Sequence, residues 1–220
     1  MNRDRPRICA TITDADAGSL RKIERLVDLY EVRIDLIGTD WRKVVGHLKK
    51  LWIACNRRRE EGGRWSGSEP RRIKELLDAI EMGAGIIDIE LETPGVEKII
   101  GKIKGRAECL VSYHDSQGTP SPGKLREIIR NELAAGGDIC KAATTAYTVQ
   151  DNLNVLRLMA EFPDNKIVAF AMGEAGQISR ILCPLVGGYF TYASVGEGRE
   201  SAAGQMTVKD LRKIYGLLKG

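Results

Sequence analysis

The chain has 220 residues, 43% of them apolar, which is enough for one well-packed core and short for two independent ones. Its 34 basic and 30 acidic residues give a net charge of +4, too mild for a nucleic-acid-binding tail. The N-terminal residues lack the apolar stretch of a signal peptide, and no segment approaches the ~20 apolar residues of a membrane span. We therefore expect one cytoplasmic domain over residues 1–220, with no membrane and no nucleic-acid partner.

Five cysteines are scattered along the chain without a C-x-x-C pair, and four of them lie in short apolar runs. Free thiols are the usual state in a reducing compartment, so we expect buried, unpaired cysteines. These residues are Cys9, Cys55, Cys109, Cys140 and Cys183.

Eight β-rich runs recur along the chain and alternate with stretches of helical periodicity. In one such stretch Ile73, Leu76, Leu77 and Ile80 follow the i, i+3, i+4, i+7 spacing of an amphipathic helix. The strands are predicted at 7–13, 30–37, 51–57, 85–90, 109–114, 138–144, 167–172 and 189–194, and the helices at 20–29, 41–48, 70–82, 96–104, 124–135, 149–161, 178–186 and 208–218.

This alternation predicts parallel strands joined by right-handed crossovers. Eight such units in this length favour a closed (β/α)₈ barrel, the TIM-barrel fold, with a doubly wound open sheet as the alternative. Since no G-x-G-x-x-G follows the first strand, a dinucleotide-binding open sheet is disfavoured.

The second predicted strand carries charges on one face. Side chains alternate across a strand, so Glu31, Arg33 and Asp35 share a face, and the fourth strand repeats the pattern with Asp88 and Glu90. The apolar face must meet the helices, which turns the charges into the barrel. Buried unpaired charges cost several kcal/mol each by usual estimates, so these residues need partners or a ligand.

One interpretation of these charges is an internal salt-bridge network that only supports the fold. The acidic residues could also bind Mg²⁺ through carboxylates. However, the sequence has no H-x-H, H-E-x-x-H or Cys/His cluster, and we expect no metal.

Lys141 interrupts the apolar run 138–144, and its strand position allows it to point into the barrel. An ordinary lysine has a pKa of ~10.4, but burial and nearby cations can lower that value and produce a nucleophilic amine. Alternatively, Lys141 is a charged partner of Glu31, Asp35 or Glu90. The two interpretations are compatible, because a pocket can hold the lysine charged in one step and neutral in another.

His114 ends the fifth strand, and barrel enzymes keep their chemistry at the carboxyl ends of strands. Its reference pKa lies near neutrality, which suits an acid/base role, although a structural histidine is the alternative. The other histidine, His47, falls in a helical stretch, where we expect a solvated face.

The remaining strand-end loops carry further polar residues. Three consecutive arginines, 57–59, precede Glu61 and a double glycine that lets the loop turn away. One of them could reach into the barrel mouth to meet an anionic substrate. Arg180 falls near a helix start and suits a carboxylate held by two bonds. Ser201 and Gln205 lie in a loop of small residues that could close over a substrate or simply be mobile.

Taken in order, these motifs resemble the type I 3-dehydroquinate dehydratases. The motifs are E-V-R-I-D at 31–35, R-x-x-x-E-G-G at 57–63, S-Y-H-D at 112–115, the lysine of the sixth strand, M-G at 172–173 with S-R at 179–180, and S-A-A-G-Q at 201–205. Each is weak alone, but together they cover nearly the whole chain. The resemblance implies a (β/α)₈ barrel that removes water from 3-dehydroquinate in the shikimate pathway of aromatic amino-acid biosynthesis.

The same resemblance implies roles for particular residues. Lys141 would form a Schiff base with the substrate, and His114, oriented by Glu61, would be the general acid/base of a syn elimination. No cofactor or metal is implied, because the lysine is the electron sink, and a homodimer is expected. Substrate hydroxyls would be held by Glu31, Arg33 and Arg57. Arg180 would hold the substrate carboxylate, and Ser201 with Gln205 would bind substrate as they close the lid.

Two other functions remain alternatives at the level of sequence. A class I aldolase also uses a barrel lysine, and glycines 187–188 and 196–198 could cradle a phosphate. A non-catalytic protein could instead use the arginine loop to bind RNA or acidic partners, although no recognition module accompanies that loop.

Overall fold

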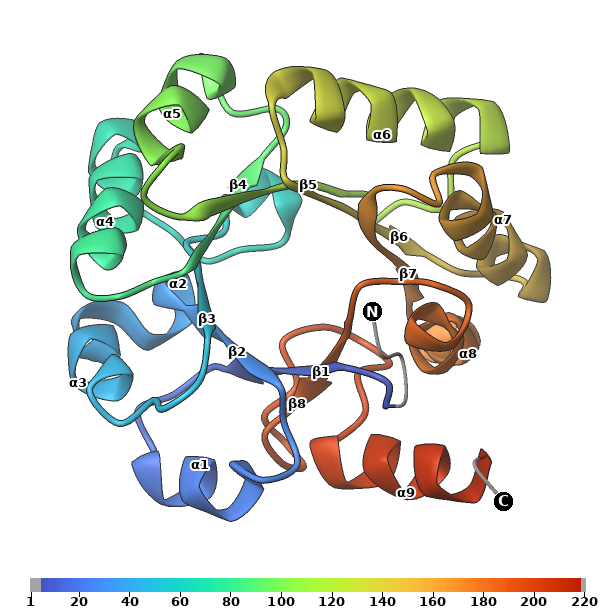
Figure 1. The fold of residues 1–220 in the computed structure, drawn as a ribbon, viewed down its shortest axis with the longest axis horizontal. Helices are drawn as coiled ribbons and strands as arrows, with labels where there is room; N and C mark the ends of the chain where they lie inside the picture. Colours follow the sequence, from blue (N-terminus) through green and yellow to red (C-terminus); the bar gives the residue numbers. More distant parts are fainter. Residues whose placement is uncertain (1–4, 219–220) are drawn as a thin grey trace.

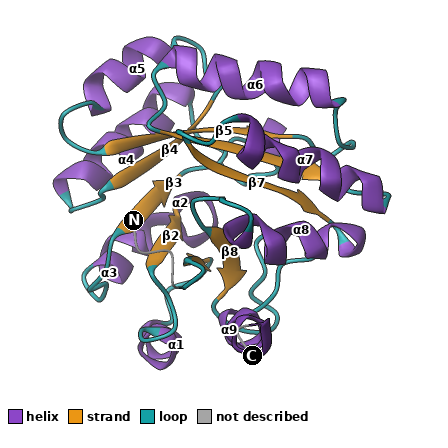
Figure 2. Cartoon of the chain, turned by 45° about the vertical axis from the view of Figure 1, so that its right-hand side comes forward, coloured by secondary structure: helices purple, strands orange, loops and turns teal. Residues whose placement is uncertain are grey.

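The computed structural model describes residues 5–218, which form a barrel of eight parallel strands ringed by helices (Figures 1 and 2). Hydrogen-bonded neighbours follow the order β7-β6-β5-β4-β3-β2-β1-β8, so β8 returns to β1. Between β7 and the start of β8, the two ends of this order, the N–H of Tyr189 donates to the carbonyl of Ile167 at 2.8 Å and closes the barrel. The predicted (β/α)₈ barrel is therefore confirmed, and the doubly wound open sheet is wrong.

The elements follow the predicted order, with one short helix, α2, that was not predicted. The strands are β1 (Ile8–Ile12), β2 (Leu29–Arg33), β3 (Trp52–Cys55), β4 (Ile86–Glu90), β5 (Glu108–His114), β6 (Ile139–Thr145), β7 (Lys166–Met172) and β8 (Thr191–Ser194). The helices are α1 (Ala17–Ile23), α2 (Ile34–Ile37), α3 (Trp41–Val45), α4 (Glu69–Glu81), α5 (Val96–Ile103), α6 (Pro122–Ala135), α7 (Val149–Glu161), α8 (Gln177–Leu182) and α9 (Val208–Leu218).

The second strand is shorter than predicted. It ends at Arg33, and residues 34–37 make a helical turn that closes on Gly38, whose φ of 69° suits glycine. The turn folds Asp35 back over Arg33, and its carboxylate accepts two bonds from that guanidinium at 2.9 and 2.8 Å. The prediction that Asp35 shares the inward strand face with Glu31 is therefore wrong, because Asp35 lies in the turn after the strand, where it pairs with Arg33.

The two-residue period of the strands sorts the barrel interior into layers. The layer nearest the amino ends of the strands is apolar and fully packed, and it consists of Cys9, Leu29, Ile53, Ile86, Leu110, Ile139, Val168 and Phe190. Two residues further along most of these strands the inward positions become largely polar, and they include Glu31, Cys55, Asp88, Ser112 and Lys141. The apolar layer thus closes the barrel interior below the polar side chains, which lie nearer the carboxyl ends of the strands.

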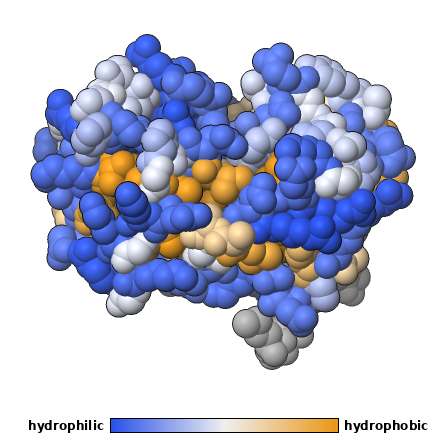
Figure 3. Space-filling view, turned by 90° about the horizontal axis from the view of Figure 1, so that it is seen from above, coloured by the Kyte–Doolittle hydropathy of each residue, from blue (hydrophilic) through white to orange (hydrophobic). Residues whose placement is uncertain are grey.

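The outer faces of the strands pack against the helices in two further apolar clusters. All five cysteines are buried free thiols, as predicted. Seen from above Figure 1, onto the side of α5 and α6, the surface is mainly hydrophilic, with a hydrophobic band across its middle (Figure 3). Among residues 5–218, no helix combines the length and apolar character needed to cross a membrane.

Candidate active site

A cavity of about 390 Å³ lies at the carboxyl ends of the strands, where the polar layers reach the barrel mouth. Every site residue predicted from the sequence lines it. They are Glu31, Arg33, Arg57, Glu61, His114, Lys141, Arg180, Ser201 and Gln205. The glycines considered as a phosphate cradle are not among its lining residues. Gly187 and Gly188 precede β8 and so lie at the opposite end of the barrel, which makes that interpretation wrong for them.

Lys141 stands in the middle of the cavity wall and is almost fully buried. Its Nζ lies 2.9 Å from Oδ2 of Asp88 and 3.5 Å from Oε1 of Glu31. Burial opposes the ammonium form, but these two carboxylates outweigh it, so the pKa of Lys141 is raised above its ordinary value. The free protein therefore holds Lys141 as an ammonium ion, and not as the neutral amine that burial alone would produce.

The aromatic ring of Tyr192 completes the surroundings of Lys141. Its centroid lies 4.4 Å from Nζ, a cation–π contact that further favours the charged lysine. Tyr192 extends from β8, which lies opposite β4 in the closed barrel and is separated from β6 by β7. Sequence reasoning missed it, since an aromatic residue in a strand gives no signal of its own.

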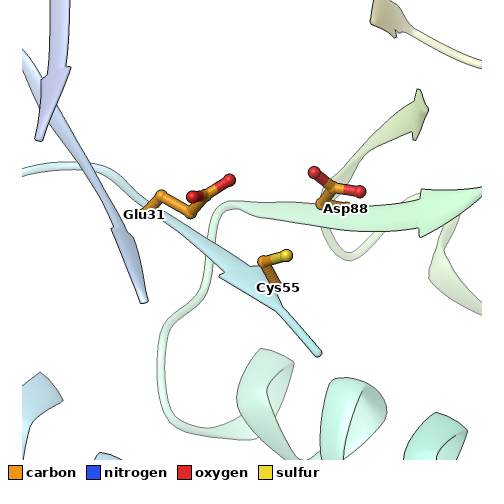
Figure 4. A group of neighbouring side chains, drawn as sticks. All are labelled: Glu31, Cys55 and Asp88. Carbon is orange, nitrogen blue, oxygen red and sulfur yellow. The ribbon is translucent and has the colours of Figure 1, made fainter. Parts of the chain in front are cut away.

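The residues Glu31, Cys55 and Asp88 point toward one another from the neighbouring strands β2, β3 and β4 (Figure 4). Their potential ligand atoms lie within 4.8 Å of one another, close enough to hold a metal ion. However, the ammonium of Lys141 already contacts both carboxylates. A cation would have to displace that ammonium, so the donor set fits the lysine itself better than a metal.

Arg57 is the arginine of the 57–59 run that turns into the barrel. Its guanidinium donates to Asp88 at 2.6 Å and to the hydroxyl of Ser112 at 2.7 Å, and it lies 3.0 Å from Glu90. Arg58 instead donates to the carbonyl of Glu92 outside the cavity. Burial opposes the charge of Asp88, but Arg57 and Lys141 hold the pKa of this carboxyl well below its usual range.

The loop after β3 can pass close to Arg57 because of its double glycine. Gly62 has a φ of 81°, and a Cβ on Gly63 would lie 2.0 Å from the carbonyl oxygen of Arg57. The loop then places the carboxylate of Glu61 against His114, 53 residues away in the chain.

His114 and Glu61 form a hydrogen-bonded pair, with Nδ1 lying 2.8 Å from Oε2. Burial, aided by the positive charges of Arg57 and Lys141, holds the pKa of His114 well below its ordinary value. Burial raises the pKa of Glu61 to about 8. Both pKa shifts favour the uncharged forms of the two side chains, because the pair is buried in the cavity wall. The neutral imidazole leaves its second nitrogen available for proton transfer.

Arg180 differs from the other buried arginines, which are Arg33, Arg57 and Arg72, because its guanidinium has no acidic partner among the described residues. It is 1% exposed, and its Nε and Nη2 lack hydrogen-bond partners. Its guanidinium carbon lies 4.3 Å from the ring centroid of Phe170. Burial lowers the pKa of Arg180 to about 10. A buried cation with unused donors beside a cavity is suited to an anion, and a carboxylate matches its two-pronged geometry.

The loop between β8 and α9 lies across the cavity mouth. The side chain of Gln205 donates to Thr11 at 3.2 Å and accepts from the N–H of Ser201 at 2.8 Å. A Cβ on Gly204 would lie 2.2 Å from the carbonyl oxygen of Gly173, so glycine is required where the loop meets the end of β7. This loop brings the hydroxyl and amide groups of 201 and 205 to the site.

Sequence reasoning also left Asp88 out of the candidate site. The signal was present, because Asp88 alternates with apolar neighbours in β4 as Glu31 does in β2. Its place beside Lys141 depended on the barrel closing, since 53 residues separate the two in the chain.

Residues 8–220 match the family model described as Type I 3-dehydroquinase. A 3-dehydroquinate dehydratase of Dehalococcoides mccartyi is 45% identical over 210 residues, covering 96% of this chain and 95% of that protein. One from Methanococcus maripaludis is 37% identical over 219 residues, covering 96% of this chain and 99% of that protein.

Solved structures support the architecture. The 3-dehydroquinate dehydratase from Geobacillus kaustophilus superposes with a TM-score of 0.84 at 24% identity, covering 98% of this chain and 92% of that one. At this level of identity the likeness speaks for the fold alone.

Proposed function

The chain belongs to the type I 3-dehydroquinase family, and from that membership we propose that it converts 3-dehydroquinate to 3-dehydroshikimate and water through an imine on Lys141. As a member it is a hydro-lyase. The observation that carries the proposed mechanism is the position of Lys141 in a cavity that also contains the His114–Glu61 pair and the unpaired Arg180.

Imine formation requires Lys141 to lose a proton, because an ammonium nitrogen has no lone pair with which to attack the ketone. In the free protein Asp88 and Glu31 hold Lys141 in that ammonium form. We infer that Nε2 of His114 takes this proton once substrate has displaced water from the cavity, which requires an ionised Glu61 that holds the ring proton on Nδ1. Asp88 then keeps the guanidinium of Arg57 as its partner, whereas Glu31, whose partner among the described residues is Lys141, becomes free to contact the substrate. The amine attacks the ring ketone, and the carbinolamine loses water to give the iminium.

The iminium withdraws electrons from the adjacent ring carbon and makes its proton acidic. In the proposed step His114 removes that proton and returns a proton to the departing hydroxyl, which leaves as water. One residue suffices for both transfers when proton and hydroxyl leave from the same face, which is a syn elimination. Glu61 holds Nδ1 and fixes the ring orientation. Hydrolysis of the imine then releases the product and restores Lys141.

The remaining cavity residues would hold the substrate. We assign the substrate carboxylate to Arg180, because its unused donors lie beside the cavity. The ring hydroxyls would meet polar groups at the mouth and floor of the site, which are Glu31, Arg33, Arg57, Ser201 and Gln205. The last two belong to the loop that crosses the mouth, so its closure would exclude water from the iminium.

The alternative is that these ions form a salt-bridge network that only supports the fold. Part of the network does pair internally, through Asp88, Arg57 and Glu90. Arg180 argues against a purely structural role, since a buried cation with no acidic partner among residues 5–218 would destabilise the fold. We further infer a place in the shikimate pathway, a cytoplasmic location and a homodimeric state.

Borohydride reduction in the presence of 3-dehydroquinate, followed by peptide mass mapping, tests the mechanism directly. We expect an adduct on the peptide containing Lys141, and none with Lys141→Ala. Replacement of the exposed Lys102 by alanine is the matched control and should leave the adduct unchanged. Adduct formation elsewhere, or full turnover of Lys141→Ala, would contradict the imine.

The ultraviolet absorbance of the conjugated enone product tests the reaction itself. Its appearance from 3-dehydroquinate separates a dehydratase from an aldolase, which would cleave a carbon–carbon bond and form no enone. A salt-dependent shift of RNA mobility that is lost when arginines 57–59 are replaced, with Lys141→Ala silent, would instead favour the RNA-binding alternative.

A further inference from the structure

Strands β1 and β8 are neighbours in the barrel, so the loops that follow them leave its carboxyl end side by side (Figure 1). The loop after β8 carries Ser201 and Gln205, which line the cavity. We call residues 195–205 of this loop the lid. In the described structure the loop after β1 supplies no lining residue, so its carboxylates Asp14 and Asp16 need an explanation other than direct contact with a ligand.

Both carboxylates contact one residue of the lid, Arg199. Its Nη2 donates to Oδ2 of Asp16 at 2.9 Å, and its Nε lies 3.4 Å from Oδ2 of Asp14. A third guanidinium nitrogen, Nη1, donates to Oδ1 of Asp14 at 3.5 Å. The hydroxyl of Thr13 also donates to the carbonyl of Arg199 at 3.5 Å. One lid side chain thus joins the two loops through every nitrogen of its guanidinium.

The two aspartates are held in place by their own loop. Oδ1 of Asp14 accepts from the N–H of Asp16 at 2.9 Å, and Asp16 in turn accepts from the N–H of Gly18 at 2.9 Å and from the hydroxyl of Ser19 at 2.8 Å. The hydroxyl of Ser19 and the guanidinium of Arg199 hold the pKa of Asp16 well below its ordinary value, so this carboxyl is ionised at neutral pH. Acceptors that are already ordered lose little side-chain entropy when a guanidinium binds them.

Arg199 anchors the outer part of the lid. Among residues 5–218, the hydrogen bonds and ion pairs between 196–200 and the rest of the chain all involve Arg199. The other bonds of this segment are internal. The inner part of the lid is attached separately, because the side chain of Gln205 donates to Thr11.

The position of Arg199 bears on the polar groups that the lid brings to the cavity. Ser201 follows two residues later, and its N–H and hydroxyl donate to the side-chain oxygen of Gln205 at 2.8 and 3.2 Å. The same amide reaches Thr11 of β1, the strand whose loop carries Asp14. The end of β1 therefore holds the lid at two points, directly at its amide and through the guanidinium at its outer end.

We propose that Arg199 is a positioning residue, whose ion pairs with Asp14 and Asp16 latch the lid over bound substrate. The three side chains are between 30% and 44% exposed, so water solvates their charges when the lid opens. Such pairs are weak enough to break on each turnover, yet together they shift the equilibrium toward the closed lid. The effect on catalysis rests on the proposed dehydratase activity, whereas the effect on the lid itself does not.

Steady-state kinetics of Arg199→Gln tests the latch. Arg199 contacts no reacting group, so it should stabilise bound substrate and transition state alike, and its loss should raise KM and leave kcat almost unchanged. We expect KM to rise about 3- to 10-fold, the effect of losing two exposed ion pairs, with kcat within about twofold of the wild type.

The double variant Asp14→Asn/Asp16→Asn removes the same ion pairs from the other loop. Asparagine keeps a side-chain oxygen that can accept the bonds within that loop, so the local fold should persist, as circular dichroism would show. We expect the same rise in KM. Adding Arg199→Gln to this double variant should raise KM little further, because a shared interaction can be lost only once.

Ionic strength separates the latch from substrate binding. Between about 0.02 and about 0.5 M NaCl, KM should rise more steeply for the wild type than for Arg199→Gln, because salt screens the exposed ion pairs of the latch. Screening of the anionic substrate is common to both proteins and does not contribute to the difference. Equal salt dependence of the two proteins would overturn the proposal.

Limited proteolysis reads the lid without any substrate. A protease specific for glutamate can cut after Glu197 or Glu200, and both residues are kept in every variant. We expect cleavage there to be at least about threefold faster in Arg199→Gln and in the double asparagine variant. The matched control is Arg126→Gln, which removes a comparably exposed pair with Glu161 and should change neither cleavage of the lid nor KM.

The outcomes of these experiments are distinct. Unchanged cleavage of the lid in both variants would overturn the latch, as would a fall in kcat at constant KM, which would assign Arg199 to the chemical step. A wild-type protein that leaves 3-dehydroquinate unchanged would contradict the proposed function, and the proteolysis comparison would then decide the latch by itself.

Discussion

The ammonium nitrogen of Lys141 lies 2.9 Å from the carboxylate of Asp88, in the wall of a cavity at the barrel mouth. The contact joins two strands of the barrel, β4 and β6, that are separated by β5. It also reverses the effect of burial, because a lysine buried without such a partner would lose its proton more readily. The catalytic proposal therefore begins from a charged lysine that must be deprotonated when substrate arrives.

Replacing Asp88 with asparagine should lower the pKa of Lys141, because burial and the charge of Arg57 would then oppose the ammonium with less compensation. We expect the rise of borohydride trapping with pH to move at least about one unit toward lower pH. Glu90→Gln is the control, since Glu90 contacts Arg57 but makes no contact with Lys141 in the described structure. A trapping profile that stays in place, or moves to higher pH, would show that Asp88 does not set this pKa.

The same substitution should cost stability in a pH-dependent way. The pKa of Asp88 is depressed in the folded chain, so its contribution is fully present above its unfolded pKa near ~4 and is lost as pH falls below that value. We expect Asp88→Asn to lose about 3–5 kcal/mol of unfolding free energy at neutral pH, because Arg57 and Lys141 keep their buried charges. Urea unfolding at pH 7 and pH 3.5 measures the difference, which should shrink at the lower pH.

Glu61→Gln should lower kcat by about 10- to 100-fold with a smaller change in KM, since His114 would lose the carboxylate that orients it. Stability gives a second readout. The folded pKa of Glu61 is raised to about 8, so its contribution is fully present below the unfolded value near ~4.5 and is lost as pH rises toward 8. The stability of the wild type relative to Glu61→Gln should therefore fall over that window. His47→Ala, at an exposed helix end, should change neither quantity.

Arg180→Met should stabilise the protein while it removes substrate binding. The substitution replaces a buried cation that has no acidic partner in the described part of the chain with an apolar side chain of similar length. We expect an unfolding free energy higher by ~1 kcal/mol or more, together with a KM raised at least about 100-fold. Thermal unfolding without substrate and steady-state kinetics measure the two effects. A large loss of stability would mean that the guanidinium has a structural partner.

Arg72→Met should have the opposite effect on stability. Arg72 is fully buried in α4, and its guanidinium bonds to Glu90 at 2.7 Å and to Glu69 at 2.9 and 2.8 Å. Removing it leaves Glu90 buried with one partner fewer, which should cost about 3–5 kcal/mol. Comparison with Arg180→Met under identical conditions separates an arginine paired within the fold from one held for a ligand. Equal effects of the two substitutions would contradict this distinction.

The sequence by itself determined the architecture and most of the cavity lining. Alternating strands and helices specify a parallel barrel, and the two-residue period of a strand specifies which side chains face inward. Lys141 and Glu31 could therefore be placed on the inner face, and His114 at the mouth, before any tertiary contact was known. These features depend only on local periodicity, which a sequence carries directly.

Contacts between distant segments were decided by the tertiary structure. Closure of the barrel brings Lys141 to Glu31 across 110 residues and selects Asp88 as its nearest carboxylate. It also directs Arg57 inward, and within residues 5–218 it leaves Arg180 without an acidic partner. Protonation states depend on such distances and on burial, because electrostatic energies vary with separation and surroundings in a way that strand periodicity does not encode.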